Sequence, residues 1–380
     1  MIEGFWIRSF RSLKRLGIGS CFELFSVVDG DVGITPFELG PVTVFAGGCG
    51  VGKSSLFDAF SFLADCFHNG LDFACRRRGG FENILHQDAQ DSFSIGLDFR
   101  LRGDADSATY AVCVGCDRNG IPFIESEILA VRRDTISIPV IFLQNGAKCI
   151  RHLAPHESFR AAELTKIEFT DYKHLGLASL EDHPAYPSFA AIRSLFDNWF
   201  PCGLAADPIG GHDKSTPRRH STEIRNLSGL IRSAAARYGD MTPRLLKRAA
   251  RFLPNVDTIY LETTPDGVPK LTFRMIDLAH PIPLSSLSGA TLRLFAYALL
   301  LEEDQPAPLI VFNEPECGFD PPHLEKFMEL VRRVIDFSRS LQLFISTQTP
   351  ELFETVPKSA VWSLEKRGSE NIAERREDRE

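Results

Sequence analysis

Apolar residues along the chain follow two spacings, and each spacing predicts a different kind of element. The segment at residues 41–46, apolar except for Thr43, predicts a short buried strand. The residues after it repeat at helical spacing on one face, at Leu56, Ala59, Phe60, Leu63 and Phe67. A strand, a glycine-rich loop at residues 47–54 and a helix are therefore expected in direct succession.

Alternating apolar and polar residues predict antiparallel strands in the first third of the chain. Residues 5–10 alternate in the manner of an edge strand, and residues 17–40 can supply a second strand pair. Residues 92–101 and 110–116 alternate too, and residues 117–120 read as the turn that follows. These segments predict an antiparallel β lobe.

The second half of the chain predicts helices, a hairpin and two further buried strands. Helical spacing extends over residues 227–250 with an interruption near Gly239, and a hairpin follows at 257–275. The apolar run at 294–301 predicts a buried helix. Short apolar runs ending in polar residues, at 308–316 and 341–350, predict strands of a central sheet.

Three stretches lack a clear period. Residues 135–211 are rich in Pro, His and Asp, and their secondary structure is left open. Residues 212–225 are polar and basic and predict an exposed loop. Residues 366–380 alternate in charge and offer no core, which predicts a frayed or disordered tail.

Composition narrows the class of protein. The 380 residues are 44% hydrophobic, enough for one large or two ordinary domains. No apolar run reaches membrane-spanning length, and residues 1–20 are too charged for a signal peptide, so no membrane association is expected. Nine scattered cysteines indicate a reducing compartment, and we expect a cytoplasmic protein. The close pair Cys113 and Cys116 has no second pair for zinc and is interpreted as structural.

The net charge of −8 argues against a protein that coats nucleic acid, although local basic patches remain possible. Three basic sets stand out, at residues 76–78, 214–225 and 244–251. The first set is either a solvated loop or a contact for a phosphate-bearing partner. The last set is either a polar helix face or a DNA-binding patch.

The loop at 47–54 fits G-x-x-x-x-G-K-[ST], a motif whose backbone N–H groups surround nucleotide phosphates. The predicted ATP-binding residues here are Gly47, Gly48, Cys49, Gly50, Val51, Gly52, Lys53, Ser54 and Ser55. Lys53 is expected to contact the β- and γ-phosphates, and the Ser54 hydroxyl is expected to ligand Mg²⁺. The predicted strand and helix on either side support the motif, because the helix dipole then faces the phosphate.

Polar residues at three later positions suggest the rest of an ATPase site. Asn313 and Glu314 end the strand at 308–312, where a metal-side residue and a water-activating carboxylate are expected. Gln348 ends the next strand and can donate a hydrogen bond to phosphate or water. Ser288, Gly289 and Ala290 precede a helix and form a second candidate anion-binding N-terminus.

These motifs, in this order, resemble the ABC-type ATPase heads of the RecF/SMC/OLD group. The resemblance is closer still to stand-alone bacterial AAA family predicted ATPases related to OLD proteins. Further matching segments are residues 9–12, 78–82, 225–227, 287–293 and 314–318. The resemblance implies an α/β P-loop NTPase: an ABC-ATPase-like head with a mixed central sheet, an antiparallel β lobe and a helical insert lobe.

The resemblance also implies a head-to-tail homodimer, or a higher even-numbered assembly, with ATP and Mg²⁺ held between heads. Ser288, Gly289 and Ala290 of one head would face the nucleotide held by Lys53 of the other. Arg11 and Ser12 would contribute to the nucleotide site, and residues 316–320 would form the D-loop. Gln87 and Gln144 are both candidates for the Q-loop glutamine.

Three departures from the family pattern predict slow hydrolysis. Cys49 replaces an asparagine near the phosphates, and Asn313 replaces the acidic residue that precedes the catalytic glutamate. Gln348 stands where a switch histidine is usual. Glu314, Lys53 and Gln348 are the predicted catalytic residues, and Ser54 and Asn313 are the predicted metal ligands.

We expect four segments in the chain. Residues 1–134 would carry the first half of the head and the β lobe, and residues 135–275 a partly helical insert. Residues 276–365 would complete the head, and residues 366–380 would form the charged tail.

The expected function is a slow ATPase that acts as a dimerisation switch for a separate effector protein or a DNA-bound complex. The resemblance suggests phage defence or DNA repair. The alternative is an ATP-binding scaffold that does not hydrolyse. A transporter ATPase subunit is disfavoured, because such subunits place a fuller signature much closer to the phosphate loop.

Overall fold

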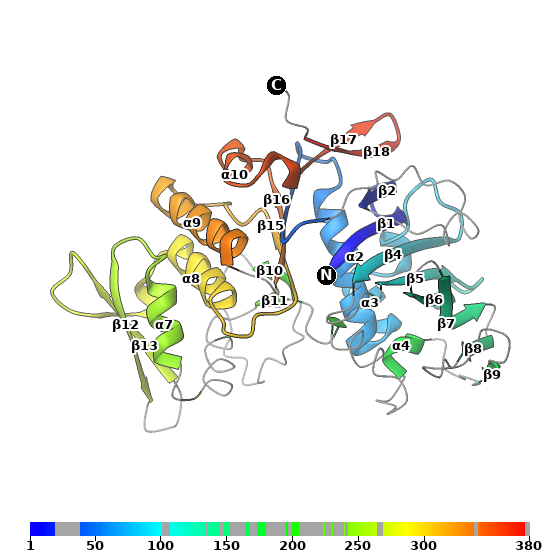
Figure 1. The fold of residues 1–380 in the computed structure, drawn as a ribbon, viewed down its shortest axis with the longest axis horizontal. Coiled ribbons are helices and arrows are strands. Elements are labelled where there is room, and N and C mark those ends of the chain that lie inside the picture. Colours follow the sequence, from blue (N-terminus) through cyan, green and yellow to red (C-terminus); the bar gives the residue numbers. More distant parts are fainter. Residues whose placement is uncertain are drawn as a thin grey trace. The chain divides into compact units, whose positions relative to one another are not determined.

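The computed structural model describes residues 1–19, 39–100, 107–133, 136–144, 147–151, 164–166, 173–179, 195–196, 200–204, 223–224, 230, 239, 242–263, 269–337 and 341–376. The chain divides into two compact units (Figure 1). Unit 1 comprises Met1–Asp197 and Ser359–Glu380, and unit 2 comprises Asn198–Lys358.

An eight-stranded antiparallel sheet dominates unit 1. Its order is β2-β1-β4-β5-β6-β7-β8-β9. The strands are β1 (Ile2–Phe10), β2 (Leu13–Gly19), β4 (Ser92–Arg100), β5 (Ser107–Cys116), β6 (Pro122–Arg133), β7 (Ile136–Gln144), β8 (Ala147–Arg151) and β9 (Leu164–Lys166). The predicted antiparallel β lobe is therefore confirmed, as are the two strands around residues 92–101 and 110–116.

The prediction of an edge strand at residues 5–10 was wrong. Strand β1 pairs with β2 on one side and with β4 on the other. Phe5, Trp6 and Ile7 are all buried, so both faces of the strand are covered. Alternation was a poor guide because Arg8 is the only exposed residue of the strand.

The remainder of unit 1 holds the predicted strand, loop and helix. Strand β3 (Val42–Ala46) is fully buried, and helix α2 (Lys53–Asn69) follows the loop. Helix α3 (Leu71–Arg77), η1 (Phe81–Asn83) and α4 (Gly176–Ser179) complete its described helices. The five apolar positions predicted for one face of α2 are all buried. Phe57 and Phe62 are buried as well, because Phe57 packs on Phe45 of β3 and Phe62 packs on the antiparallel sheet.

Aromatic rings join α2 to the antiparallel sheet. The Phe5 ring meets the Phe60 ring edge-on with centroids 5.1 Å apart. Phe10, Phe62 and Phe93 form a second group with centroid separations of 5.2 to 5.8 Å. Such edge-to-face pairs add roughly 0.5–1.5 kcal/mol each beyond the apolar area that they bury.

The end of the chain is ordered further than predicted. Strand β17 (Val361–Arg367) runs parallel to β3 and forms an antiparallel hairpin with β18 (Glu370–Arg375). The expectation of a frayed tail from residue 366 was therefore wrong up to Arg375. Alternating charge concealed two strands because the buried residue of β18 is a polar one, Asn371.

Unit 2 contains parallel strands in the order β11-β10-β15-β16. They are β10 (Phe200–Leu204), β11 (Glu223–Ile224), β15 (Leu309–Asn313) and β16 (Gln342–Thr347). Its helices are α7 (Thr242–Ala250), α8 (Gly289–Leu301), α9 (Pro321–Phe337) and α10 (Pro350–Thr355), with η3 (Leu284–Ser286) and the boundary turn η4 (Lys358–Ala360). The buried helix at 294–301 and the strands at 308–312 and 341–345 are confirmed.

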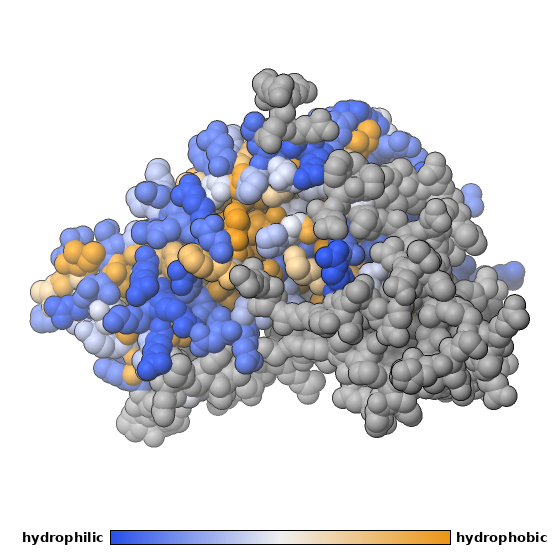
Figure 2. All heavy atoms as spheres, viewed as in Figure 1, coloured by the Kyte–Doolittle hydropathy of each residue, from blue (hydrophilic) through white to orange (hydrophobic). Residues whose placement is uncertain are grey.

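A small antiparallel sheet extends unit 2. Strand β12 (Val256–Thr263) pairs with β13 (Pro269–Met275), which pairs with β14 (Ile282–Pro283), so the predicted hairpin is confirmed. Its turn at 265–267 lies outside the described residues, as does most of 212–241. Figure 2 shows apolar side chains in view over this β12–β13 lobe, among hydrophilic neighbours. Ile276 and Leu278, after β13, are 68% and 48% exposed.

Within the described residues, no helix is long and apolar enough to cross a membrane. Cys113 and Cys116 are free thiols on β5. Burial raises the pKa of the Cys113 thiol to about 11, which is the behaviour of a structural, unreactive cysteine.

Candidate functional site

The loop at residues 47–54 leads from β3 into the first turn of α2. Gly50 and Gly52 have φ angles of +79° and +105°, in the region where a Cβ is strained. Gly52 is the N-cap of α2 and makes no side-chain cap. Because glycine has no side chain, the N-cap itself does not occupy the first N–H groups of the helix, which suits an anion-binding N-terminus.

Close packing beneath the loop also requires two of its glycines. A Cβ on Gly47 would lie 2.6 Å from the Leu364 carbonyl oxygen of β17. A Cβ on Gly52 would lie 2.5 Å from Leu13 Cδ2 of β2. Gly48 and Gly50 have open space instead, and Cys49 is exposed. The loop thus rests on two strands while its outer residues face outward.

Lys53 is the first residue of α2 and is only 4% exposed. Its Nζ donates to the Gly47 and Gly48 carbonyl oxygens at 2.7 and 2.8 Å. The ammonium group is therefore fixed within the loop, where it adds positive charge to the helix N-terminus. Ser54 is exposed beside it.

Asn371 of β18 braces this loop and was missed by the sequence analysis. Its Nδ2 donates to the Val51 carbonyl oxygen at 3.0 Å, and its Oδ1 accepts from the Lys14 N–H at 3.3 Å. The residue is 7% exposed. The sequence does contain a signal for the hairpin that carries Asn371. Gly368 lies between two short alternating stretches, a pattern that indicates a hairpin turn and not a tail.

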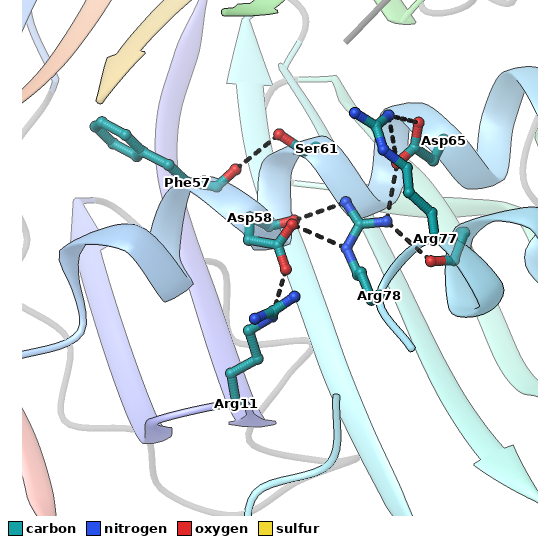
Figure 3. A network of polar contacts seen from close by, with 8 residues as sticks. Arg11, Phe57, Asp58, Ser61, Asp65, Arg77 and Arg78 are labelled. Atoms are coloured by element: carbon teal, nitrogen blue, oxygen red, sulfur yellow. Dashed lines mark hydrogen bonds and ion pairs between the residues drawn. The ribbon is translucent and has the colours of Figure 1, made fainter. Parts of the chain in front are cut away.

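Arg11 and Ser12, predicted to contact the nucleotide, follow β1 and contact α2. The Ser12 and Ser55 hydroxyls lie 2.7 Å apart. Arg11 Nε lies 2.5 Å from Asp58 Oδ2 (Figure 3). Arg11 has a φ angle of 51°, unusual for a non-glycine residue, and its N–H donates to the Ile84 carbonyl oxygen at 2.6 Å.

The ion pair of Arg11 continues into a buried network. Arg78 Nε lies 2.9 Å from Asp58, and Arg78 Nη1 lies 2.8 Å from Asp65. Arg77 also contacts Asp65, at 3.0 Å (Figure 3). The Arg78 and Asp65 side chains are 4% and 2% exposed. Removing either partner would break this buried pair and leave the other charge with one ion-pair partner fewer, which should destabilise the fold. Arg78 would then keep Asp58, or Asp65 would keep Arg77.

This network corrects the interpretation of residues 76–78. Arg77 lies in α3 and Arg78 at its C-terminus, and both face carboxylates of α2 instead of solvent or a phosphate-bearing partner. Their partners Asp58 and Asp65 lie more than ten residues away, on a different helix, so local charge could not reveal the pairing. Only Arg76 is exposed.

In unit 2, Glu314 directly follows β15. Its φ angle is 46°, and its N–H donates to the Ser346 carbonyl oxygen of β16 at 3.0 Å. Gln348 Nε2 donates to Glu314 Oε1 at 2.7 Å. A non-glycine residue in a left-handed conformation at a strand end is a typical way of holding a functional side chain in a fixed direction.

Neighbouring residues complete this loop. Asn313 is exposed, and its Oδ1 accepts from the Ser346 hydroxyl at 2.7 Å. Glu316 accepts from the Thr347 hydroxyl and, at 3.4 Å, from the Gln348 N–H. Burial and the nearby Glu316 and Glu314 carboxylates raise the pKa of the Cys317 thiol, whose Sγ lies 3.8 Å from Glu314 Oε2.

Helix α8 begins at the candidate signature segment. Ser288 is its N-cap, and its Oγ accepts from the Thr291 N–H at 3.1 Å. Gly289 and Ala290 are its first two helical residues. The Thr291 hydroxyl lies 2.9 Å from His323 Nε2, so the start of α8 is tied to the start of α9.

Comparisons with known proteins bear on the fold and the general class of the chain. Residues 188–354 match the family described as "AAA domain, putative AbiEii toxin, Type IV TA system". Protein ea59 of Escherichia phage lambda is 31% identical over 95 residues. That stretch is 25% of this chain and spans only 18% of the phage protein.

Two solved structures match nearly the whole chain in fold. One is an SMC head bound to the C-winged helix domain of ScpA, with a TM-score of 0.56, 14% identity, and coverage of 98% of this chain and 96% of that chain. The chain has the fold of an SMC head. The second is an Smc head with an extended coiled coil, bound to the C-terminal domain of ScpA derived from Pyrococcus furiosus. Its TM-score is 0.57 at 12% identity, covering 98% and 95%.

The SMC-head fold confirms the predicted fold class and the resemblance to ABC-type ATPase heads. Together with the AAA domain match, it supports an ATPase of this general type. No group of three or more His, Cys, Asp or Glu side chains within the described part of the chain is arranged to hold a metal ion.

Within each unit, the structure brings some predicted site residues together. In unit 1 the start of α2 brings together the phosphate loop, Lys53, Ser54, Ser55 and Ser12. In unit 2 Asn313, Glu314 and Gln348 meet at the ends of β15 and β16, whereas Ser288, Gly289 and Ala290 lie at the start of α8. Of the Q-loop candidates, Gln87 is exposed after η1 and Gln144 ends β7, and the choice between them stays open.

The basic set at 244–251 is divided by the structure. Lys247 and Arg251 are exposed, but Arg248 Nη2 contacts the Glu302 carbonyl oxygen at 2.6 Å and Asp304 at 2.8 Å. Arg333 of α9 also contacts Glu302, with its Nε 2.5 Å from the carboxylate. Arg248 therefore joins α7 to the end of α8.

Proposed function

We propose that this chain is an ATPase that binds ATP at the loop of residues 47–54 and hydrolyses it slowly, with Glu314 as the base. The observation that carries the proposal is the uncapped start of α2, with Lys53 fixed within it and left-handed glycines before it. This arrangement supplies backbone donors and a point charge for the β- and γ-phosphates.

Of the two proposed Mg²⁺ ligands, Ser54 suits the ion better than Asn313 does. Ser54 is exposed and presents a hydroxyl oxygen at the first turn of α2. Asn313 offers only a neutral amide oxygen, which already accepts from Ser346. When bound, Mg²⁺ would neutralise charge on the phosphate oxygens. The weak Asn313 ligand is one reason to expect slow turnover.

In the proposed hydrolysis step, Glu314 accepts a proton from water as that water attacks the γ-phosphorus, and the bond to the bridging oxygen breaks to release ADP and phosphate. Gln348 donates to Glu314 Oε1 and fixes the direction of the carboxylate that would accept the proton. The Ser346 carbonyl oxygen holds the Glu314 backbone in place. Gln348 carries no charge, so it can orient the base but cannot itself stabilise the developing phosphate charge.

We propose further that ATP closes two copies of the chain into a two-fold dimer. Ser288, Gly289 and Ala290 of one copy would contact the nucleotide held by the other, and hydrolysis would release the pair. This switch would control a separate effector protein or a DNA-bound complex in phage defence or DNA repair. A similar SMC head is bound to a domain of ScpA, which supports a partner protein here. We place this activity in the cytoplasm.

Steady-state ATPase activity with Mg²⁺ tests the enzymatic part of the proposal. The wild-type protein should turn over ATP, and Glu314→Gln should lose turnover while still binding ATP. Gln348→Ala should retain ATP binding and lower turnover by about tenfold, because the base loses a single orienting hydrogen bond. Equal turnover in wild type and Glu314→Gln would exclude Glu314 as the base.

The hydrogen bond from Ser346 to Asn313 also favours a second candidate function, an ATP-binding scaffold without turnover. The two candidates differ in one result. A scaffold binds ATP and shows no hydrolysis in the wild type, whereas the proposed ATPase hydrolyses ATP and depends on Glu314. Pull-down of proteins encoded nearby, in ATP and in ADP, would then test whether a partner responds to the nucleotide.

A further inference from the structure

A line of four polar side chains connects the start of α8 to the loop before α9. The Ser288 and Thr291 hydroxyl oxygens lie 2.9 Å apart, and Thr291 Oγ1 lies 2.9 Å from His323 Nε2. His323 Nδ1 lies 2.5 Å from Asp320 Oδ1. Thr291 and His323 are 7% and 8% exposed, whereas Ser288 and Asp320 at the two ends are exposed.

The chemistry of Asp320 fixes the direction of these hydrogen bonds. The hydrogen bond from His323 lowers the pKa of the Asp320 carboxyl, which is therefore ionised and can only accept. His323 Nδ1 must then carry a proton. In the neutral ring Nε2 has no proton and accepts from the Thr291 hydroxyl. Thr291 has no second proton, so Ser288 O–H donates to Thr291 Oγ1.

In this state Ser288 can donate outward only by giving up its hydrogen bond to Thr291. Its single proton points at Thr291, and one of its lone pairs accepts the Thr291 N–H at 3.1 Å. While the hydrogen bond to Thr291 Oγ1 is kept, an anion at the start of α8 would meet an oxygen without a proton. The direction reverses when His323 gains a second proton: Nε2–H donates to Thr291, Thr291 donates to Ser288, and Ser288 O–H becomes free.

We propose that Thr291 and His323 are positioning residues that set the direction of the Ser288 hydroxyl. Donation from Ser288 to a phosphate oxygen is thereby coupled to uptake of one proton at His323. This inference rests on the proposed function for its ligand, the γ-phosphate of ATP held by a second copy. It adds that closure of the dimer consumes protons and weakens as the pH rises.

The surroundings of His323 leave Asp320 as the charge that acts on it most directly. Phe319 stacks on the imidazole ring with centroids 6.0 Å apart. Arg293 of α8 donates to the Cys317 carbonyl oxygen in the same loop, and Lys326 of α9 pairs with Glu329 farther along the helix. Capping of α8 does not require the Thr291 hydroxyl or His323, because Ser288 already caps the helix by accepting the Thr291 N–H.

Thr291→Val tests the coupling with little change in shape. Valine keeps the backbone N–H that Ser288 caps but breaks the line between Ser288 and His323. Thr291→Ser is the matched control, because it retains the hydroxyl. Each change is made in the full chain with Glu314→Gln, so that ATP is held without turnover.

Calorimetry at pH 7 in two buffers of different ionisation enthalpy measures the protons taken up when ATP closes the dimer. More protons should be taken up by the protein with Thr291 intact and by Thr291→Ser than by Thr291→Val. The difference should be as much as one proton for each Ser288 that donates to a phosphate oxygen. ADP should show no such difference. As the pH rises, the dimer affinity should fall more steeply in the protein with Thr291 intact and in Thr291→Ser than in Thr291→Val.

Equal proton uptake and parallel pH profiles in all three proteins, with ATP-dependent dimers intact, would overturn this inference and leave the proposed function standing. Absence of ATP binding in every protein would instead overturn the proposed function, and the inference with it.

Discussion

Helices α2 and α8 both begin at a glycine-containing segment, but their N-termini are completed in different ways. Gly52 caps α2 in a left-handed conformation and offers no side-chain acceptor. Ser288 caps α8 and accepts one of the helix's own N–H groups. The first N-terminus presents backbone donors to a ligand, whereas the second presents one side-chain hydroxyl. We infer that α2 supplies ATP affinity and that α8 supplies recognition that depends on closure.

The largest expected effect on ATP affinity follows from removing the charge at α2. Lys53→Met keeps the aliphatic stem but loses the ammonium group, which accounts for roughly 1.5–3 kcal/mol of charge-assisted hydrogen bonding. ATP affinity of the single chain should therefore fall by about ten- to a hundredfold. Titration with a fluorescent ATP analogue measures this fall. Unchanged affinity would mean that the loop does not hold the phosphates.

A smaller effect on ATP affinity is expected from removing the Asn371 side chain, which is hydrogen-bonded to the same loop. Asn371→Ala removes two hydrogen bonds and leaves the Val51 carbonyl oxygen and Lys14 N–H without these partners. The free energy of unfolding should drop by roughly 1–3 kcal/mol, and ATP should bind several-fold more weakly. Denaturant melts and the same ATP titration measure both. Ser369→Ala, in the adjacent turn, is the control, and equal effects in both variants would contradict a specific brace.

The smallest effect on single-chain ATP affinity should come from α8. Ser288→Asn retains a side-chain cap but loses the hydroxyl, so stability should change by less than about 0.5 kcal/mol. ATP affinity of the monomer should be unchanged, and only ATP-dependent dimerisation should weaken. Thermal melts and ATP titration at low protein concentration check this. A loss of monomer affinity comparable with that of Lys53→Met would remove the distinction between the two helices.

The contrast between α2 and α8 also explains which parts of the candidate site could be predicted from the sequence. The loop before α2 is read from adjacent residues, because backbone conformation and one lysine define it. Glu314 and Gln348 were predicted from two strand ends, and the structure joins them at 2.7 Å. Asn371 was missed because it acts across more than three hundred residues. Arg78 was misread because the carboxylates that neutralise it lie on another helix.

Local patterns failed wherever burial depended on distant neighbours. Strand β1 reads as an edge strand from its own residues, and only pairing with β2 and β4 shows otherwise. The line from Ser288 to Asp320 similarly depends on α8 and α9 lying together. Hydrogen-bond direction in that line follows from tautomers and not from residue spacing.

The molecular mass of Glu314→Gln in ATP and in ADP tests the central claim most directly. We expect a monomer in ADP and a dimer in Mg²⁺-ATP, with the dimer lost when either Lys53→Met or Ser288→Asn is added. That result would show that the starts of α2 and α8 serve one nucleotide from two copies of the chain. A protein that binds ATP fully and stays monomeric, or a dimer that persists with Ser288→Asn, would contradict this account.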